Sequence, residues 1–90
     1  MSKPMNQQDK VLSEIFRAAG RFIIEGGKLP DMHGDERQIR VVRRAALASR
    51  RFYEALCNES ATLDAVSVMM EERRRAAEDF KRVLGHEWRF

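Results

Sequence analysis

The sequence predicts an all-α protein of three helices, in which a long antiparallel helical hairpin carries an N-terminal helix packed on it. Three observations support this fold class. Apolar residues recur at three- and four-residue spacing over most of the chain, which is the periodicity of helices with one buried side. Most of the five glycines and two prolines lie between these stretches. The second and third stretches carry matching apolar seams and are separated by a short turn, which is typical of a hairpin.

The first helix is expected over residues 7–25, after a frayed lead at residues 1–6. Its predicted buried side consists of Val11, Leu12, Ile15, Phe16, Ala19, Phe22 and Ile23. Gly26 and Gly27 follow directly, and glycine commonly ends a helix. The segment from Gly26 to Gly34 contains Pro30 and is therefore expected to be a loop.

The second helix is expected over residues 35–57, with Asp35 as its N-cap. Its apolar seam is Ile39, Val42, Ala46, Ser49, Tyr53 and Leu56. The third helix is expected over residues 61–84, capped by Ser60 or Thr62 and ended by Gly85. Its seam is Leu63, Val66, Met70, Arg73, Ala77, Phe80 and Leu84. These seams are predicted to pack on each other, as in a short coiled coil.

The 90 residues are expected to form a single helical domain, residues 1–90, with residues 85–90 as a tail. A chain of this size has only just enough core to be stable alone, so we expect a homo-oligomer. Four outer apolar positions of the second helix strengthen that expectation, because one partner helix would not cover them: Val41, Ala45, Ala48 and Phe52.

The compartment predicted from the sequence is the cytoplasm. The single cysteine, Cys57, cannot form an intramolecular disulfide, which fits a reducing environment. The first eight residues are polar and do not resemble a signal peptide. The longest apolar runs have three or four residues, so no membrane span and no membrane partner are expected.

One side of the second helix is predicted to be cationic. Residues 37–51 contain six arginines, no lysine and no carboxylate. At 100° per residue, four of these arginines fall within about 60° of one another and the other two lie beside them. Arginine favours bidentate recognition of phosphate or carboxylate. The predicted partner-binding residues are Arg37, Arg40, Arg43, Arg44, Arg50 and Arg51; the alternative is an ordinary solvated surface.

Two further features leave alternatives open. Trp88 and Phe90 either fold back onto the first helix or anchor a partner, and they are included among the candidate partner-binding residues. Folding back is favoured. Arg73 interrupts the apolar seam of the third helix, where it either extends to water or pairs with a carboxylate of another chain. We favour the former.

No catalytic residues, cofactor or metal site are predicted. The chain lacks a convergent acid, base and nucleophile, and His33 and His86 do not have metal-ligand spacing. Cys57 is interpreted as a packing residue. Gly26-Gly27-Lys28 departs from the phosphate-loop pattern on both sides. Helix-turn-helix and ribbon-helix-helix architectures fit poorly, since the helices are too long and no N-terminal strand is expected.

The function predicted from these features is non-catalytic binding of an anionic partner through the cationic helix side. Nucleic acid is the first candidate partner, contacted through its phosphates. The alternative is a protein-binding inhibitor or adaptor, such as a small phage-encoded protein that docks on an acidic or DNA-binding surface of a host complex. The scarcity of lysine beside the arginines weakens the first candidate.

Overall fold

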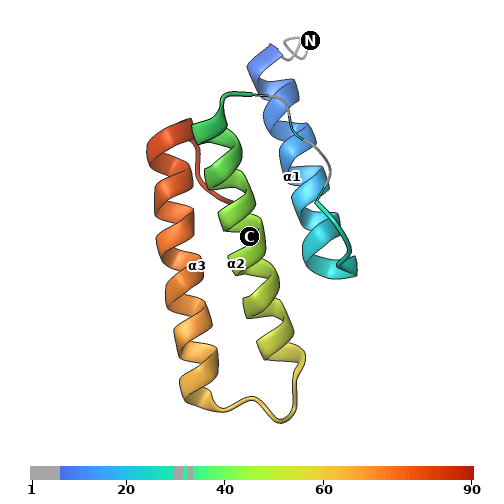
Figure 1. Ribbon diagram of the computed structural model, residues 1–90, viewed down its shortest axis with the longest axis vertical. Coiled ribbons are helices and arrows are strands. Elements are labelled where there is room, and N and C mark those ends of the chain that lie inside the picture. Colours follow the sequence, from blue (N-terminus) through green and yellow to red (C-terminus); the bar gives the residue numbers. More distant parts are fainter. Residues whose placement is uncertain (1–6, 30–31, 33) are drawn as a thin grey trace, which may run out of the picture.

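The computed structural model describes residues 7–29, 32 and 34–90, and these form three α-helices (Figure 1). They are α1 (Gln7–Glu25), α2 (Glu36–Cys57) and α3 (Leu63–Leu84). No strand occurs in this part of the chain. The predicted all-α class and all three helices are therefore confirmed, with ends that differ by two residues at most. The lead predicted at residues 1–6 lies outside the described residues.

The helix ends follow from capping chemistry. The Asp35 carboxylate accepts a hydrogen bond of 2.8 Å from the Gln38 backbone N–H, so it satisfies a donor that the first turn of α2 leaves free. Of the two candidate caps for α3, Thr62 is the one used, because its hydroxyl accepts from the Ala65 N–H at 3.1 Å. Gly85 ends α3 in the left-handed conformation that glycine adopts without strain.

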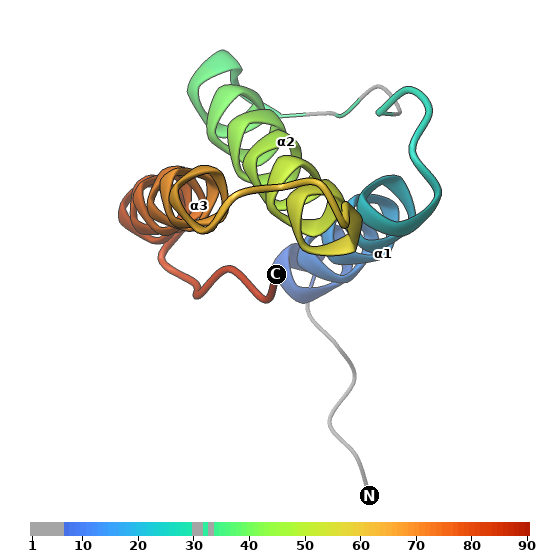
Figure 2. The same ribbon diagram turned by 90° about the horizontal axis from the view of Figure 1, so that it is seen from below.

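Helix α2 is the central element (Figure 2). It contacts α3 on one side, as an antiparallel hairpin, and α1 on the other. Between α1 and α3, the C-terminal segment 85–90 crosses from the end of α3 toward α1. The core is thus assembled by three helices and one irregular segment.

The prediction that α2 and α3 pack through their two seams is wrong, because each helix uses a neighbouring side for this contact. The two helices meet through small residues nearer one side of the seams: Ala48 of α2 lines a groove with Glu72 and Arg75 of α3, and Ala45 and Ala76 are completely buried. The upper half of the predicted seams instead faces the C-terminal segment, through Ser49 and Phe80, which both contact Trp88. The lower half is exposed. Sequence periodicity defines a buried arc but not how several neighbours divide it.

The four outer apolar positions of α2 do not support an oligomer, contrary to the prediction, because α1 and α3 share the cover of α2. Val41, Ala45 and Ala48 are buried within the single chain, and Phe52 is partly buried. Helices α1 and α3 cover the widened arc between them, so these residues leave no apolar surface for a second copy.

The C-terminal segment folds back, as favoured from the sequence. Trp88 is buried, and its indole N–H donates to the Ser49 hydroxyl at 2.9 Å. Its ring lies 5.7 Å from that of Phe16 and 5.0 Å from that of Phe80, measured between centroids. Such tilted and edge-on aromatic contacts add to the stability that burial provides. The segment therefore fills the space between α1 and α3.

The Arg73 side chain holds the end of this segment. Its Nε donates to the main-chain carbonyl oxygen of Phe90, and its guanidinium lies 5.9 Å from the Phe52 ring centroid. Neither sequence interpretation of Arg73 described this contact, because the acceptor belongs to a segment 17 residues away in the same chain.

Candidate anion-binding face

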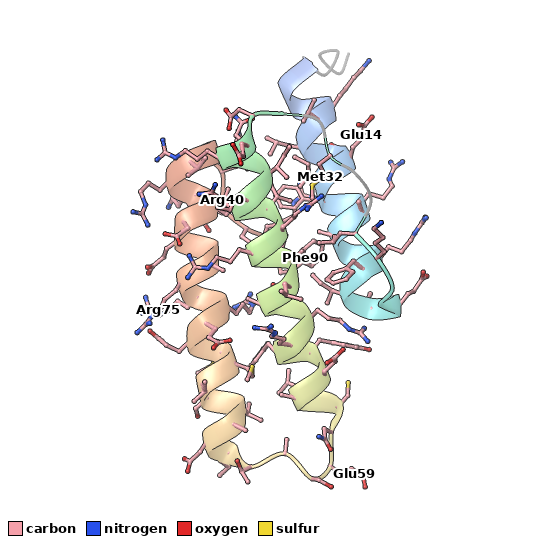
Figure 3. All side chains as sticks on the ribbon, viewed as in Figure 1. Glu14, Met32, Arg40, Glu59, Arg75 and Phe90 are labelled. Carbon is pink, nitrogen blue, oxygen red and sulfur yellow. The ribbon has the colours of Figure 1, made fainter. Side chains whose placement is uncertain are left out.

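Four of the six arginines of residues 37–51 extend from α2 into solvent: Arg37, Arg40, Arg43 and Arg51. Figure 3 shows Arg40 near the start of α2. Its side chain is 74% exposed, and the carboxylate paired with it, that of Glu36 at 3.8 Å, is 91% exposed. Exposed pairs at that distance contribute little stability. Among the described residues, Arg37, Arg43 and Arg51 form no ion pair.

Arg44 belongs to the same side of α2 but is paired across the hairpin. Its Nη1 donates to an Asp79 carboxylate oxygen at 2.6 Å, and Asp79 also accepts from Arg82. The Arg44 side chain remains 58% exposed, so part of its guanidinium is still accessible. We use the term arginine face for the five residues Arg37, Arg40, Arg43, Arg44 and Arg51.

Arg50 differs from the other five arginines because it serves the packing of α1. Its Nη1 donates to the carbonyl oxygens of Ile23 and Ile24 at 2.6 and 3.1 Å, and its Nε donates to Glu54 at 2.6 Å. The last carbonyls of a helix lack internal donors and carry partial negative charge. Helix α1 has no basic residue in its own last turn, so Arg50 supplies that cation from α2.

A shallow groove beside the arginine face brings in residues that sequence reasoning missed. The groove has a volume of about 300 Å³ and is lined by Arg44, Leu47, Ala48 and Arg51 from α2 and by Glu72 and Arg75 from α3. Leu47 is 43% exposed there. The face is therefore a cationic strip with one aliphatic and one acidic neighbour. The helical position of Leu47 between the arginines could have been predicted from the sequence. The presence of Arg75 and Glu72 in the groove could not, because it depends on how α3 packs against α2.

Trp88 and Phe90 lie apart from the arginine face. Trp88 is buried, and Phe90 is partly buried with its ring against Gly20 of α1. Both aromatic residues thus pack in the core of this chain, so their rings are not exposed for a partner.

Other candidate chemistry is not assembled in the described part of the chain. Cys57 is exposed at the end of α2, so its interpretation as a packing residue is wrong. No three His, Cys, Asp or Glu side chains converge as metal ligands among residues 7–29, 32 and 34–90. None of the three described helices combines the length and apolar character needed to cross a membrane.

No known protein family, curated protein or solved structure matches this chain significantly.

Proposed function

We propose that this protein is a non-catalytic binding protein whose arginine face engages an anionic partner, with nucleic acid phosphates as the first candidate. One observation carries the proposal: four exposed guanidinium groups lie along one side of a rigid helix, and only Arg44 of that side is neutralised from α3. Like charges spaced three and four residues apart repel each other, which costs helix stability. A bound polyanion would remove that cost.

The dimensions of the face suit several phosphates at once. Arg37 and Arg51 are 14 positions apart, which corresponds to about 21 Å along the helix axis. Each guanidinium that neutralises a phosphate releases condensed counterions, so affinity should fall steeply with salt. Contacts of this kind position a protein on nucleic acid without reading its sequence.

The test compares two variants that each lose three positive charges. The first carries Arg37→Ala, Arg40→Ala and Arg51→Ala, none of which removes a hydrogen bond or ion pair to α1 or α3 among the described residues. The control carries Lys10→Ala, Arg17→Ala and Arg21→Ala, which are exposed on α1. Binding of a short labelled DNA duplex and of a single-stranded oligonucleotide is measured by fluorescence anisotropy over a salt series.

We expect the α2 variant to bind at least about tenfold more weakly at low salt, and the control to bind nearly as well as the parent. The slope of log affinity against log salt should also become shallower by about 0.9 for each duplex phosphate that the variant no longer neutralises. Equal reductions in affinity for both variants would mean that only net charge matters, and this would refute the assignment to α2.

A second candidate partner, an acidic protein surface, is favoured by the groove composition. The exposed aliphatic side chain of Leu47 finds no apolar contact on a phosphate backbone, whereas a protein surface that combines acidic and apolar residues can contact both Leu47 and the arginines. Leu47→Asn separates the two candidates. It should leave oligonucleotide binding unchanged while weakening binding to a protein partner, and that partner should remain bound after nuclease treatment with a defined stoichiometry.

A further inference from the structure

The lower half of the hairpin exposes an apolar surface, for which we use the term distal hairpin face. It consists of Tyr53 and Leu56 from α2 and Leu63, Val66 and Met70 from α3. Leu63 is 86% exposed, Leu56 59%, Met70 52% and Tyr53 37%. Figure 1 shows that this half of the hairpin extends beyond the end of α1. Neighbouring exposed apolar side chains of this kind mark interaction surfaces.

The distal hairpin face continues the side of the hairpin that the C-terminal segment covers. Residues seven apart lie on nearly the same side of a helix. Leu56 is seven residues after Ser49, which bonds to Trp88, and Val66 is seven residues before Arg73, which bonds to Phe90. Met70 is likewise seven residues before Ala77, which packs against the core. One apolar side thus runs the length of the hairpin and is covered along only half of it.

Within residues 7–29, 32 and 34–90, no segment covers the open half, where Leu56, Leu63 and Met70 stay exposed. The loop after α1 returns to the start of α2, and Met32 within it lies between α1 and α2 at the upper half of the hairpin (Figure 3).

We propose that the distal hairpin face binds a second copy of this chain in an antiparallel, two-fold symmetric arrangement. Two helical hairpins that join their open apolar sides form a four-helix bundle, the usual way such hairpins complete a core. A two-fold axis uses the same five residues on each copy, so each face covers the other. The axis would pass close to Val66 and Met70, at the middle of the face.

Charge selects the antiparallel orientation. Residues 52–72, which form the end of the hairpin, contain five carboxylates and no lysine or arginine. Three consecutive arginines, Arg73–Arg75, follow directly. In a parallel dimer the two acidic ends would lie together and repel. In the antiparallel dimer, the acidic end of one copy lies near the level of Arg74 and Arg75 of its partner. These two arginines pair with Glu71 in their own chain but remain 56% and 67% exposed, so they can also attract the acidic end.

The dimer would leave the arginine face accessible, because that face lies on the side of α2 opposite the covered seam. Each assembly would then carry two arginine faces pointing away from the shared bundle. The two sites could engage one long polyanion or two partners, which raises apparent affinity through effective concentration. The dimer itself does not depend on the proposed function.

The first experiment measures mass by sedimentation equilibrium at micromolar concentration for the full chain and three variants. Leu56→Gln and Met70→Gln alter the face, and Val68→Gln is the matched control, because Val68 is 54% exposed on another side of α3. We expect a dimer for the parent and the control, and a dimer dissociation constant raised about a hundredfold in each face variant. A monomeric parent, or a dimer equally weakened by all three changes, would overturn the proposal.

The second experiment tests the orientation with a spin label attached to the cysteine of Glu36→Cys. The variant also carries Cys57→Ser, so that each chain has only one thiol to label. The proposed axis lies near the level of Tyr53, which is 17 positions from Glu36, so antiparallel copies place the two labels roughly 50 Å apart, and parallel copies place them much closer. Distances near the longer value in pulsed electron paramagnetic resonance support the arrangement. A short distance would overturn it.

Discussion

The six arginines of residues 37–51 show how far neighbouring side chains of one chemical type can differ in role. Arg50 is largely buried by α1, with a side chain 22% exposed, and it holds two main-chain carbonyls. Arg43, seven residues earlier on nearly the same stripe of α2, is exposed. The difference arises because the last turn of α1 lies at the level of Arg50. Position along the neighbouring helix, not residue type, decides which arginine is structural.

Arg50→Ala is therefore expected to destabilise the fold by about 1–2 kcal/mol, because it leaves the last carbonyls of α1 without donors. Arg43→Ala, which removes the same charge and no described contact, should change the free energy of unfolding by less than about 0.5 kcal/mol. Urea denaturation followed by circular dichroism measures both values. Equal effects in the two variants would contradict the structural role of Arg50.

At the scale of the helix, α1 contains Gly20 in its interior, where the helix propensity of glycine is unfavourable. Alanine is more favourable than glycine in a helix interior by about 1 kcal/mol. A Cβ added at Gly20, however, would lie 3.1 Å from the Phe90 ring. The close approach of the C-terminal segment thus accounts for glycine at this position.

A double-mutant cycle tests that explanation. Gly20→Ala alone should fail to stabilise the protein, because the Phe90 ring must shift to accept the added methyl group. In a Phe90→Ala background the same substitution should raise the free energy of unfolding by about 0.5–1 kcal/mol, as propensity predicts. If Gly20→Ala stabilised both backgrounds equally, the contact between these two residues would carry no energetic weight.

Helix α3 also contains a pH-dependent element. The hydrogen bond from Arg74, together with the positive charges of Arg74 and Arg75, lowers the pKa of Glu71 below its ordinary value near 4.5, against a smaller opposing effect of desolvation. A carboxylate with a lowered folded-state pKa contributes stability that is fully present above its ordinary pKa. That contribution is lost as pH falls through the lowered value.

Glu71→Gln should accordingly remove part of the acid sensitivity of the fold. At neutral pH the variant should be slightly less stable than the parent, because the ion pair at an exposed site is weak. The difference between the two should shrink as pH falls from about 4.5 downward. Urea midpoints across that range measure it, and a difference that is constant with pH would exclude a contribution from Glu71.

At the scale of the whole molecule, the core is concentrated at one end. All buried residues of α2 and α3 lie in residues 41–49 and 76–80, where α1 and the C-terminal segment cover the hairpin. Residues 50–75 contain no buried side chain. The hairpin is continuous in secondary structure but uneven in packing, so its two halves should differ in local stability.

Hydrogen exchange should reveal this difference in a single chain. At concentrations low enough to keep the protein monomeric, amides of residues 53–70 should exchange faster than those of residues 41–49 and 76–84. Raising the concentration should slow exchange in the first group if the distal hairpin face is covered by a second copy. Uniform protection along the hairpin at low concentration would contradict the uneven packing.

The sequence by itself determined the helices, because their ends and buried arcs depend on local chemistry. Asp35, Thr62 and Gly85 act within one turn of their own position, and the apolar period needs only the helix geometry. The location of the cationic side on α2 follows from the same local geometry. These features could be predicted without knowing how any two helices meet.

Only the tertiary structure decided which neighbour covers each side and which arginine is used within the chain. The contacts of Arg50 with Ile23, of Arg73 with Phe90 and of Trp88 with Ser49 join residues 17–39 positions apart. Periodicity gives the direction of a side chain around its own helix but not the distance to another element. Packing sets that distance, so it also decided that α2 lies between α1 and α3 and that no described part of the chain covers the distal hairpin face.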